Sequence, residues 1–201
     1  MKINLSINET SPAMDFERIA TELMNDWVVQ INLKRYRIAE VEFYFKSDKH
    51  LDPYSHEHPL QKEMGKWYFH GSGIDITFGN NNYHGGILLR AIYDIEMKRF
   101  IYGPLNTVAE IFSNFSSVFD GAFVFKLSPA IANEFEKEEV INAPRVGLNS
   151  NLDEIYHKKH YRFLIMPKEK HANKGEIAEA LRSSKSLDEI NKIFGYKILN
   201  D

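Results

Sequence analysis

Two glutamates in one predicted strand are the residues of this chain best placed for acid–base chemistry. Residues 37–45 alternate as a β-strand with an apolar face. Glu40, Glu42 and Tyr44 share the other face. In a two-layer domain that face can simply meet water, and two glutamates there need no function. A carboxylate beside an aromatic ring can also act as a general base, so the neighbouring residues decide between these interpretations.

Two further residues favour a site on this face. His56 follows the strand in the loop of residues 52–56 and offers an imidazole. Arg90 lies inside a second apolar strand, where an unpaired guanidinium is costly to bury. Together with Tyr44 beside Glu42, these residues favour a functional site on this face over a solvated surface.

Other catalytic chemistries have weaker support in this sequence. The chain contains no cysteine, which excludes disulfides, thiolate zinc sites and cysteine catalysis. His50, His56 and His58 lie close together, and His-x-His spacing can bind zinc. Because no clear carboxylate partner accompanies them, we expect no metal and no cofactor. Neither Ser55 nor Ser72 has the Gly-x-Ser-x-Gly context of a nucleophile elbow.

The elements that must position these residues predict an α+β fold. Without a linker or a repeat, the 201 residues indicate a single domain with a curved, mostly antiparallel β-sheet flanked by helices, and a helical tail over residues 171–201. Thr107 with Glu110, and Ser186 with Glu189, have the spacing of capping boxes. Helices are expected at residues 15–27, 107–115, 176–182 and 187–194, and strands at residues 37–45, 66–70, 74–78, 87–95, 122–127 and 158–166.

Composition limits the class of protein. With 43% hydrophobic and 26% charged residues, wholesale disorder is excluded. No apolar run approaches the roughly 18 residues of a membrane span, and the first residues lack a secretory pattern, so we expect a cytoplasmic protein. A formal net charge of −3 argues against strong non-specific polyanion binding but leaves room for a local basic face.

Six short motifs follow one another between residues 37 and 165. They are Ala39-Glu40-Val41-Glu42-Phe43-Tyr44, Asp52-Pro53-Tyr54-Ser55-His56, Gly85-Gly86-Ile87-Leu88-Leu89-Arg90-Ala91, Gly103-Pro104, Ala143-Pro144-Arg145-Val146-Gly147 and Tyr161-Arg162-Phe163. As an ordered set they resemble the alkyladenine (3-methyladenine) DNA glycosylases, which flip a damaged purine out of DNA and hydrolyse its N-glycosidic bond. The fold implied is the β-rich α+β domain of that family, related to the C-terminal domain of formyltransferases.

The resemblance implies a role for each matching residue. Glu42 corresponds to the glutamate that activates water, and Arg90 to the arginine behind that water. Among the residues that bind the base, Tyr44 matches a stacking aromatic residue and His56 a hydrogen-bonding histidine. Asn80 matches an asparagine that narrows the pocket against guanine. The strand alternation places Glu42 and Tyr44 on one face, and the resemblance implies that both project into one pocket with His56 and Arg90.

Three departures from the family pattern concern DNA binding. Gly73 stands where a tyrosine normally wedges into the duplex, and His70 stands where a second stacking tyrosine is usual, although an imidazole can also stack. Phe69 and Ile74 are the apolar neighbours on that hairpin, and the strand pattern gives no reason for either to point outward. The region after Arg90 is also shorter than usual.

Phosphate contacts are expected from the basic residues near residue 160. The candidates are Lys158, Lys159 and Arg162, with a second basic stretch at residues 168–174, and the alternative is a solvated surface cluster of charges.

Three functions remain open at this stage. The first is a glycosylase-like hydrolase acting on a modified purine in DNA. The second is the same pocket acting on a nucleoside-like small molecule or a single strand, which Gly73 and the acidic net charge favour. The third is a non-catalytic binding protein. We expect a monomer in each case.

Overall fold

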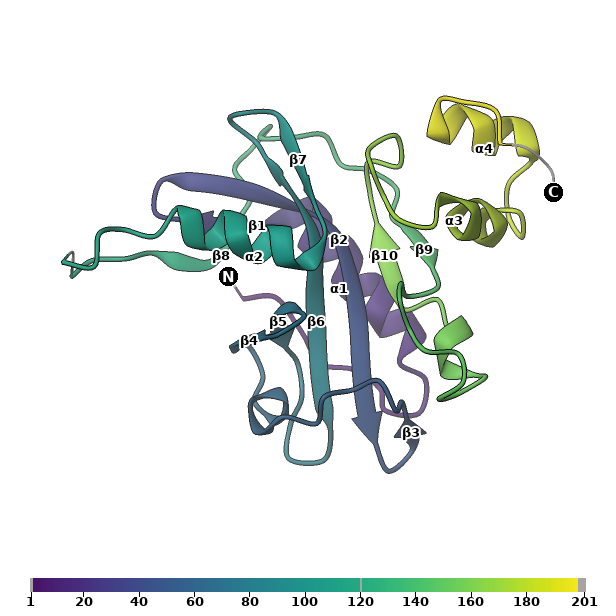
Figure 1. Ribbon diagram of the computed structural model, residues 1–201, viewed down its shortest axis with the longest axis horizontal. Coiled ribbons are helices and arrows are strands. Elements are labelled where there is room, and N and C mark those ends of the chain that lie inside the picture. The colour runs from purple at the N-terminus through teal and green to yellow at the C-terminus, as the bar shows by residue number, and fades with distance from the viewer. Residues whose placement is uncertain (1, 120, 199–201) are drawn as a thin grey trace.

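A curled antiparallel β-sheet flanked by helices forms the molecule, which confirms the predicted α+β class (Figure 1). The computed structural model describes residues 2–119 and 121–198. The helices are α1 (Ala13–Asp26), α2 (Pro104–Ser113), α3 (Lys174–Leu181) and α4 (Leu187–Phe194), and the strands are β1 (Trp27–Ile31), β2 (Lys34–Ser47), β3 (His50–Leu51), β4 (Trp67–His70), β5 (Gly73–Thr77), β6 (His84–Asp94), β7 (Arg99–Tyr102), β8 (Phe125–Pro129), β9 (Ile141–Ala143) and β10 (Arg162–Leu164).

The two longest strands, β2 and β6, form the centre of the sheet. The strand order is β4-β5-β6-β2-β1-β8, and β6 pairs with β2 along nearly its whole length. The other edge of β2 is shared, because β1 pairs with its first residues, β10 with Glu40–Glu42 and β3 with its end. The chemistry-bearing part of β2 therefore lies between β6 and β10.

A double β-bulge interrupts the pairing of β2 with β6. Glu40 pairs with Ala91 and Val41 with Leu89, so Arg90 has no opposite residue on β2. A bulge redirects a side chain out of the regular alternation of a strand. Arg90 lies in this bulge, and its guanidinium points toward Glu40 and Glu42 of β2.

The apolar face of β2 packs on α1, as the alternation predicts. The Phe43 ring stacks on Phe16 of α1 with 4.5 Å between centroids, and Phe163 of β10 meets its edge at 5.4 Å. The opposite face does not meet water, because Glu40 and Glu42 are both fully buried. The interpretation of these glutamates as a solvated surface is therefore wrong.

The C-terminal helices form a small second core against β9 and β10 (Figure 1). The capping box of Ser186 and Glu189 is confirmed at the start of α4. The box predicted at Thr107 is wrong, because α2 begins at Pro104 and Thr107 lies inside the helix. Proline has a fixed φ suited to a first helical position, so the helix begins at Pro104 and not after Thr107. The predicted strand at residues 158–166 shortens to β10, and the one at 122–127 shifts to β8.

None of the helices in the described ranges has the length and the apolar character that crossing a bilayer requires.

Candidate functional site

A pocket of about 250 Å³ opens beside β2 and β6. Its walls come from the β4–β5 hairpin, the start of α2, the loop of residues 52–56 and the loop of residues 146–148. Four of the predicted site residues line it: Tyr44, His56, His70 and Arg90. Segments far apart in the sequence thus meet at one cavity.

Glu42 does not project into the pocket as expected: it is fully buried and lies behind the lining, in contact with the lining residues Tyr44, Arg90 and Val146. Its Oε2 accepts hydrogen bonds from the Tyr44 hydroxyl at 2.8 Å and from Arg90 Nη1 at 3.2 Å. Its Oε1 accepts the Val146 backbone N–H at 2.6 Å. A carboxylate has about four acceptor positions, so these three donors leave one position for a further donor such as water.

Burial raises the pKa of Glu42 above its usual range, even though Arg90, the Val146 N–H and the Tyr44 hydroxyl oppose that shift. Burial also raises the pKa of Tyr44, with a further contribution from the charge of Glu42, so the phenol keeps its proton. Burial alone lowers the pKa of Arg90, but the carboxylates of Glu42 and Glu40 raise it above its usual value. A permanently charged guanidinium in the pocket wall thus contacts a carboxylate of raised basicity behind it.

Glu40 is the second carboxylate of the network and holds three basic side chains. Its Oε1 accepts from Arg90 Nε and Arg162 Nε, both at 2.9 Å, and His171 Nδ1 lies 2.5 Å from its Oε2. The other ring nitrogen of His171 lies 3.0 Å from the Met166 carbonyl oxygen, so both ring nitrogens face oxygen atoms. Burial raises the pKa of Glu40, but His171, Arg162 and Arg90 together lower it to about 2. Glu40 therefore stays ionised and anchors Arg90.

The structure corrects the expected role of Arg162. Its side chain is fully buried against Glu40, and its Nη2 donates to the Ala172 carbonyl at 3.0 Å, so it is not placed for a surface phosphate contact. Lys158 and Lys159 are exposed. Lys158 borders a surface hollow with Gly147 and Leu148, the same two residues that reach the pocket beside Glu42.

An ion pair that the sequence reasoning did not assign supports the loops of the pocket. The Arg145 guanidinium binds Asp52 through two hydrogen bonds, at 2.7 and 3.1 Å, and both side chains are fully buried. It also donates to the Phe43 carbonyl at 3.0 Å and lies 4.7 Å from the centre of the Tyr44 ring. Both residues lie in the six motifs of the sequence analysis, and this was the only indication in the sequence that they belong to the site. The pair positions Tyr44 and the adjacent Val146 N–H.

Asp75 is a second residue that the sequence reasoning missed, and it fixes the His70 ring. The Ser72 N–H donates to His70 Nδ1 at 3.2 Å, so the ring proton is on Nε2, which donates to Asp75 Oδ1 at 3.0 Å. Gln61 donates to the other Asp75 oxygen at 3.2 Å. His56 meets the His70 ring edge-on, with 4.5 Å between centroids. His70 is therefore a fixed aromatic wall and has no free nitrogen for proton transfer.

The pKa of His56 is lowered from its usual value by partial desolvation and by the neighbouring His70. A neutral imidazole in the pocket lining can donate one hydrogen bond and accept another.

Asn80 does not lie where the resemblance implies. It is exposed in a turn, where its backbone pairs with Tyr83 and its side chain accepts the Asn82 N–H at 2.8 Å. It is not part of the pocket lining. The expectation that Asn80 narrows the pocket is therefore wrong for this arrangement of the turn.

Within the described part of the chain, no group of three or more histidine, aspartate or glutamate side chains is arranged to hold a metal ion. Of the three histidines with zinc-like spacing, His50 is engaged elsewhere. Its ring nitrogens lie 2.9 Å from the Phe45 carbonyl and 2.9 Å from the Tyr161 hydroxyl.

Fold and site together define an α+β protein with a buried carboxylate–guanidinium pair behind an aromatic-walled pocket. No model of a known protein family matches the chain. The chain is similar to an uncharacterized protein of Acanthamoeba polyphaga mimivirus, with 26% identity over 187 residues, covering 75% of this chain and 85% of the viral protein. This relative carries no assigned activity, so a functional proposal rests on the site.

Proposed function

We propose that the protein hydrolyses the N-glycosidic bond of a modified purine, with Glu42 activating the attacking water. The observation that carries this proposal is the buried Glu42 carboxylate, held by Arg90 and Val146 behind a pocket of about 250 Å³. Pockets for drug-sized ligands span roughly 300–1,000 Å³, so this volume suits a single planar base.

The chemical step uses the free acceptor position on Glu42. Glu42 takes a proton from the bound water, and the water oxygen forms a bond to C1′. The C1′–N bond breaks with its electron pair remaining on the purine. The carboxylate also stabilises the positive charge that develops on the sugar, and its raised pKa makes it a stronger base near neutral pH.

Arg90 keeps this base charged and in place. It bridges Glu42 and Glu40, so the positive charge is shared between two carboxylates rather than being neutralised by Glu42 alone. Tyr44 donates to Glu42 and presents its ring to the cavity, where a base can stack against an aromatic face. His56 and His70 form the facing aromatic wall.

The leaving group must be a good one, because neither histidine of the pocket is a ready acid. His70 has both ring nitrogens occupied, and the lowered pKa of His56 keeps its ring neutral. A cationic alkylated purine leaves as a neutral base and requires no acid. The proposal therefore favours 3-methyladenine and 7-methylguanine over hypoxanthine, which needs a proton to leave as a neutral base.

Gly73 supports an unstacked substrate as the second candidate. It has φ +149° and is buried, and a Cβ there would lie 2.7 Å from Leu88 Cδ1 and 3.0 Å from Pro104 Cβ. A wedge side chain has no room at this position. Ile74 is buried as well, whereas Phe69, contrary to expectation, is 40% exposed. Phe69 neighbours His70 on β4 and points to the opposite face, away from the pocket. A single strand or a nucleoside therefore fits better than an intact duplex.

The experiment is release of free base from one panel of modified purines. 3-Methyladenine, 7-methylguanine and hypoxanthine are presented in duplex DNA, in single strands and as nucleosides, and the released base is quantified by chromatography. We expect release of the alkylated bases, faster from single strands or nucleosides than from duplex. Binding without release would support the non-catalytic alternative. Tight, lesion-specific binding to duplex would contradict the preference for an unstacked base.

A further inference from the structure

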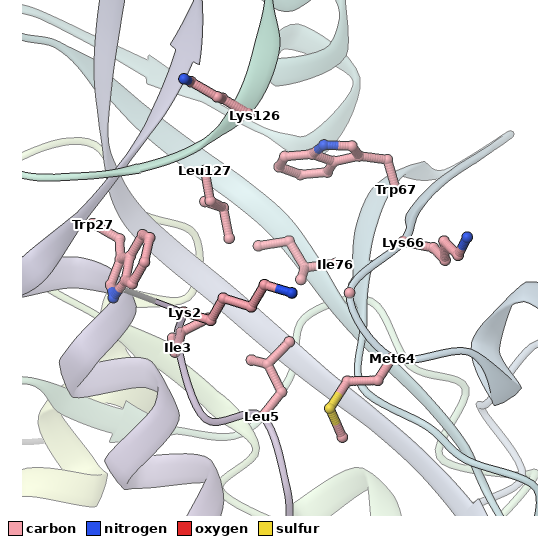
Figure 2. Close-up of a pocket in the computed structure, with 11 residues that line it drawn as sticks. Lys2, Ile3, Leu5, Trp27, Met64, Lys66, Trp67, Ile76, Lys126 and Leu127 are labelled. Atoms are coloured by element: carbon pink, nitrogen blue, oxygen red, sulfur yellow. The ribbon is translucent and has the colours of Figure 1, made fainter.

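A second cavity, of about 480 Å³, lies where the two ends of the curled sheet approach each other. β4 and β8 are the outermost strands of the sheet order, and Trp67 of β4 stacks on Phe125 of β8 with 4.4 Å between centroids. Below this contact the cavity opens between Ile76 of β5 and Leu127 of β8. Lys2, Ile3 and Leu5 border it from the N-terminal segment (Figure 2).

This cavity is separate from the Glu42 pocket, and the two share no lining residue. The alternation of β5 explains the separation, because Asp75 faces the Glu42 pocket while its neighbour Ile76 faces the second cavity. A ligand can therefore bind here without displacing the residues of the proposed reaction.

The walls of the second cavity combine an apolar surface with positive charge. Five apolar side chains line it together with Trp27 and Trp67, and Figure 2 shows the two indole rings on different sides of the space. These apolar residues are Ile3, Leu5, Met64, Ile76 and Leu127. The charged lining residues are three lysines, Lys2, Lys66 and Lys126, and the lining contains no acidic residue.

The lysines differ in their position. Figure 2 shows the Lys2 side chain extending across the cavity toward Ile76, whereas the ends of Lys66 and Lys126 point away from it. Lys66 is paired with Glu63 at 3.4 Å. Lys2 is thus the cation best placed to meet a ligand, and the other two add positive potential at the rim.

We propose that this cavity binds a medium-chain hydrocarbon carboxylate, with its chain between the two tryptophans and its carboxylate on the Lys2 ammonium. Charge complementarity selects an anion, and the aliphatic lining selects an extended apolar body. A nucleotide requires hydrogen-bonding groups that read a base and several donors for phosphate, whereas the Trp27 indole N–H is already bonded to Glu22 at 3.3 Å.

The test uses decanoate as the probe and tryptophan fluorescence as the signal. The chain contains two tryptophans, and both line this cavity, so their emission reports its occupancy directly. Decanoate, kept below its micelle concentration, is titrated against the wild-type chain, with decanol as the uncharged control. We expect a saturable change in emission and tighter binding of decanoate than of decanol.

Two charge variants sharpen the test. Lys2→Glu reverses the charge that extends across the cavity and is expected to weaken decanoate binding roughly fivefold or more, while binding of decanol stays unchanged. Lys49→Glu makes the same change in the exposed turn between β2 and β3 and should leave both affinities unchanged. Equal affinities for decanoate and decanol, equal binding by Lys2→Glu and wild type, or no saturable signal would each overturn the proposal.

Discussion

The two faces of strand β2 bury side chains of opposite character. On one face, Phe43 packs against Phe16 and Phe163 in an aromatic core. On the other face, Glu40 and Glu42 are equally buried but are surrounded by guanidinium, imidazole and hydroxyl groups. One strand thus supports both the main core and the candidate site.

The two faces of β2 contribute differently to the stability of the fold. Burial of the Phe43 ring is favourable in itself, since apolar surface leaves water. Burial of Glu40 and Glu42 is costly, and replacing such charged groups by apolar residues is often neutral or stabilising in other proteins. Stability alone therefore does not account for the charged face, and we propose that the reaction in the pocket in front of Glu42 does.

The largest expected effect comes from removing the shared carboxylate. Glu40→Ala leaves Arg90, Arg162 and His171 buried without their common partner, and we expect a loss of about 5 kcal/mol, the upper end of the range for a broken buried pair. Urea unfolding measures this change. Adding Arg162→Met to Glu40→Ala removes one buried charge that has lost its partner, and it should recover part of the lost free energy of unfolding. An unchanged stability in Glu40→Ala would contradict the charged network.

On the apolar face, Phe43→Ala is expected to cost about 3–5 kcal/mol, because it leaves a cavity between α1 and β10. The free energy of unfolding is measured at two pH values, near 3 and near 7. In contrast to Glu40→Ala, the destabilisation should be the same at both, since no titrating group is removed. A strong pH dependence would show that the two faces are coupled.

The pH dependence of stability distinguishes the two glutamates. The folded pKa of Glu40 is about 2 against an ordinary 4.5, so its stabilisation is present above pH 4.5 and is lost as the pH falls toward 2. The loss is about 3 kcal/mol. The pKa of Glu42 is raised, so its effect on the stability of the fold has the opposite pH dependence. The contribution of Glu42 to folding stability is present below pH 4.5 and is lost as the pH rises.

Unfolding of wild type and Glu40→Gln between pH 2 and pH 5 isolates the Glu40 contribution, with the exposed Glu96→Gln as the control. Wild type should lose more stability than Glu40→Gln over this range. Parallel curves would show that Glu40 titrates normally.

The smallest effect is expected far from both faces, at the start of α4. Ser186 caps this helix through the Glu189 backbone N–H, and Ser186→Ala should cost about 1 kcal/mol. Thermal unfolding measures it, and base release should be unaffected. A loss of activity in this variant would connect the C-terminal helices to the site.

Local sequence patterns correctly predicted the two faces of β2 and the start of α4. The alternation of residues 37–45 placed Phe43 and Glu42 on opposite faces, and the capping box of Ser186 was found from spacing alone. Both depend on residues only a few positions apart. The α+β class followed from the same local patterns.

The remainder depended on contacts between distant segments. Arg162 looked like a surface cation because its partner, Glu40, lies 122 positions away across a strand pair. Arg145 and Asp52 are 93 positions apart, and no local pattern joins them. The prediction for Asn80 was wrong because the resemblance implies a role for this residue but does not give the conformation of the turn in which it lies.

The most direct test of the proposed reaction is single-turnover base release by wild type and Glu42→Gln from one single-stranded oligonucleotide that contains 7-methylguanine. The substitution keeps the shape of the side chain and removes its charge and basicity, while fluorescence anisotropy measures binding in parallel. We predict that release falls roughly 10²–10⁴-fold and that affinity is unchanged. Equal release by both proteins, or no release by wild type, would contradict the assignment of Glu42 as the base that activates water.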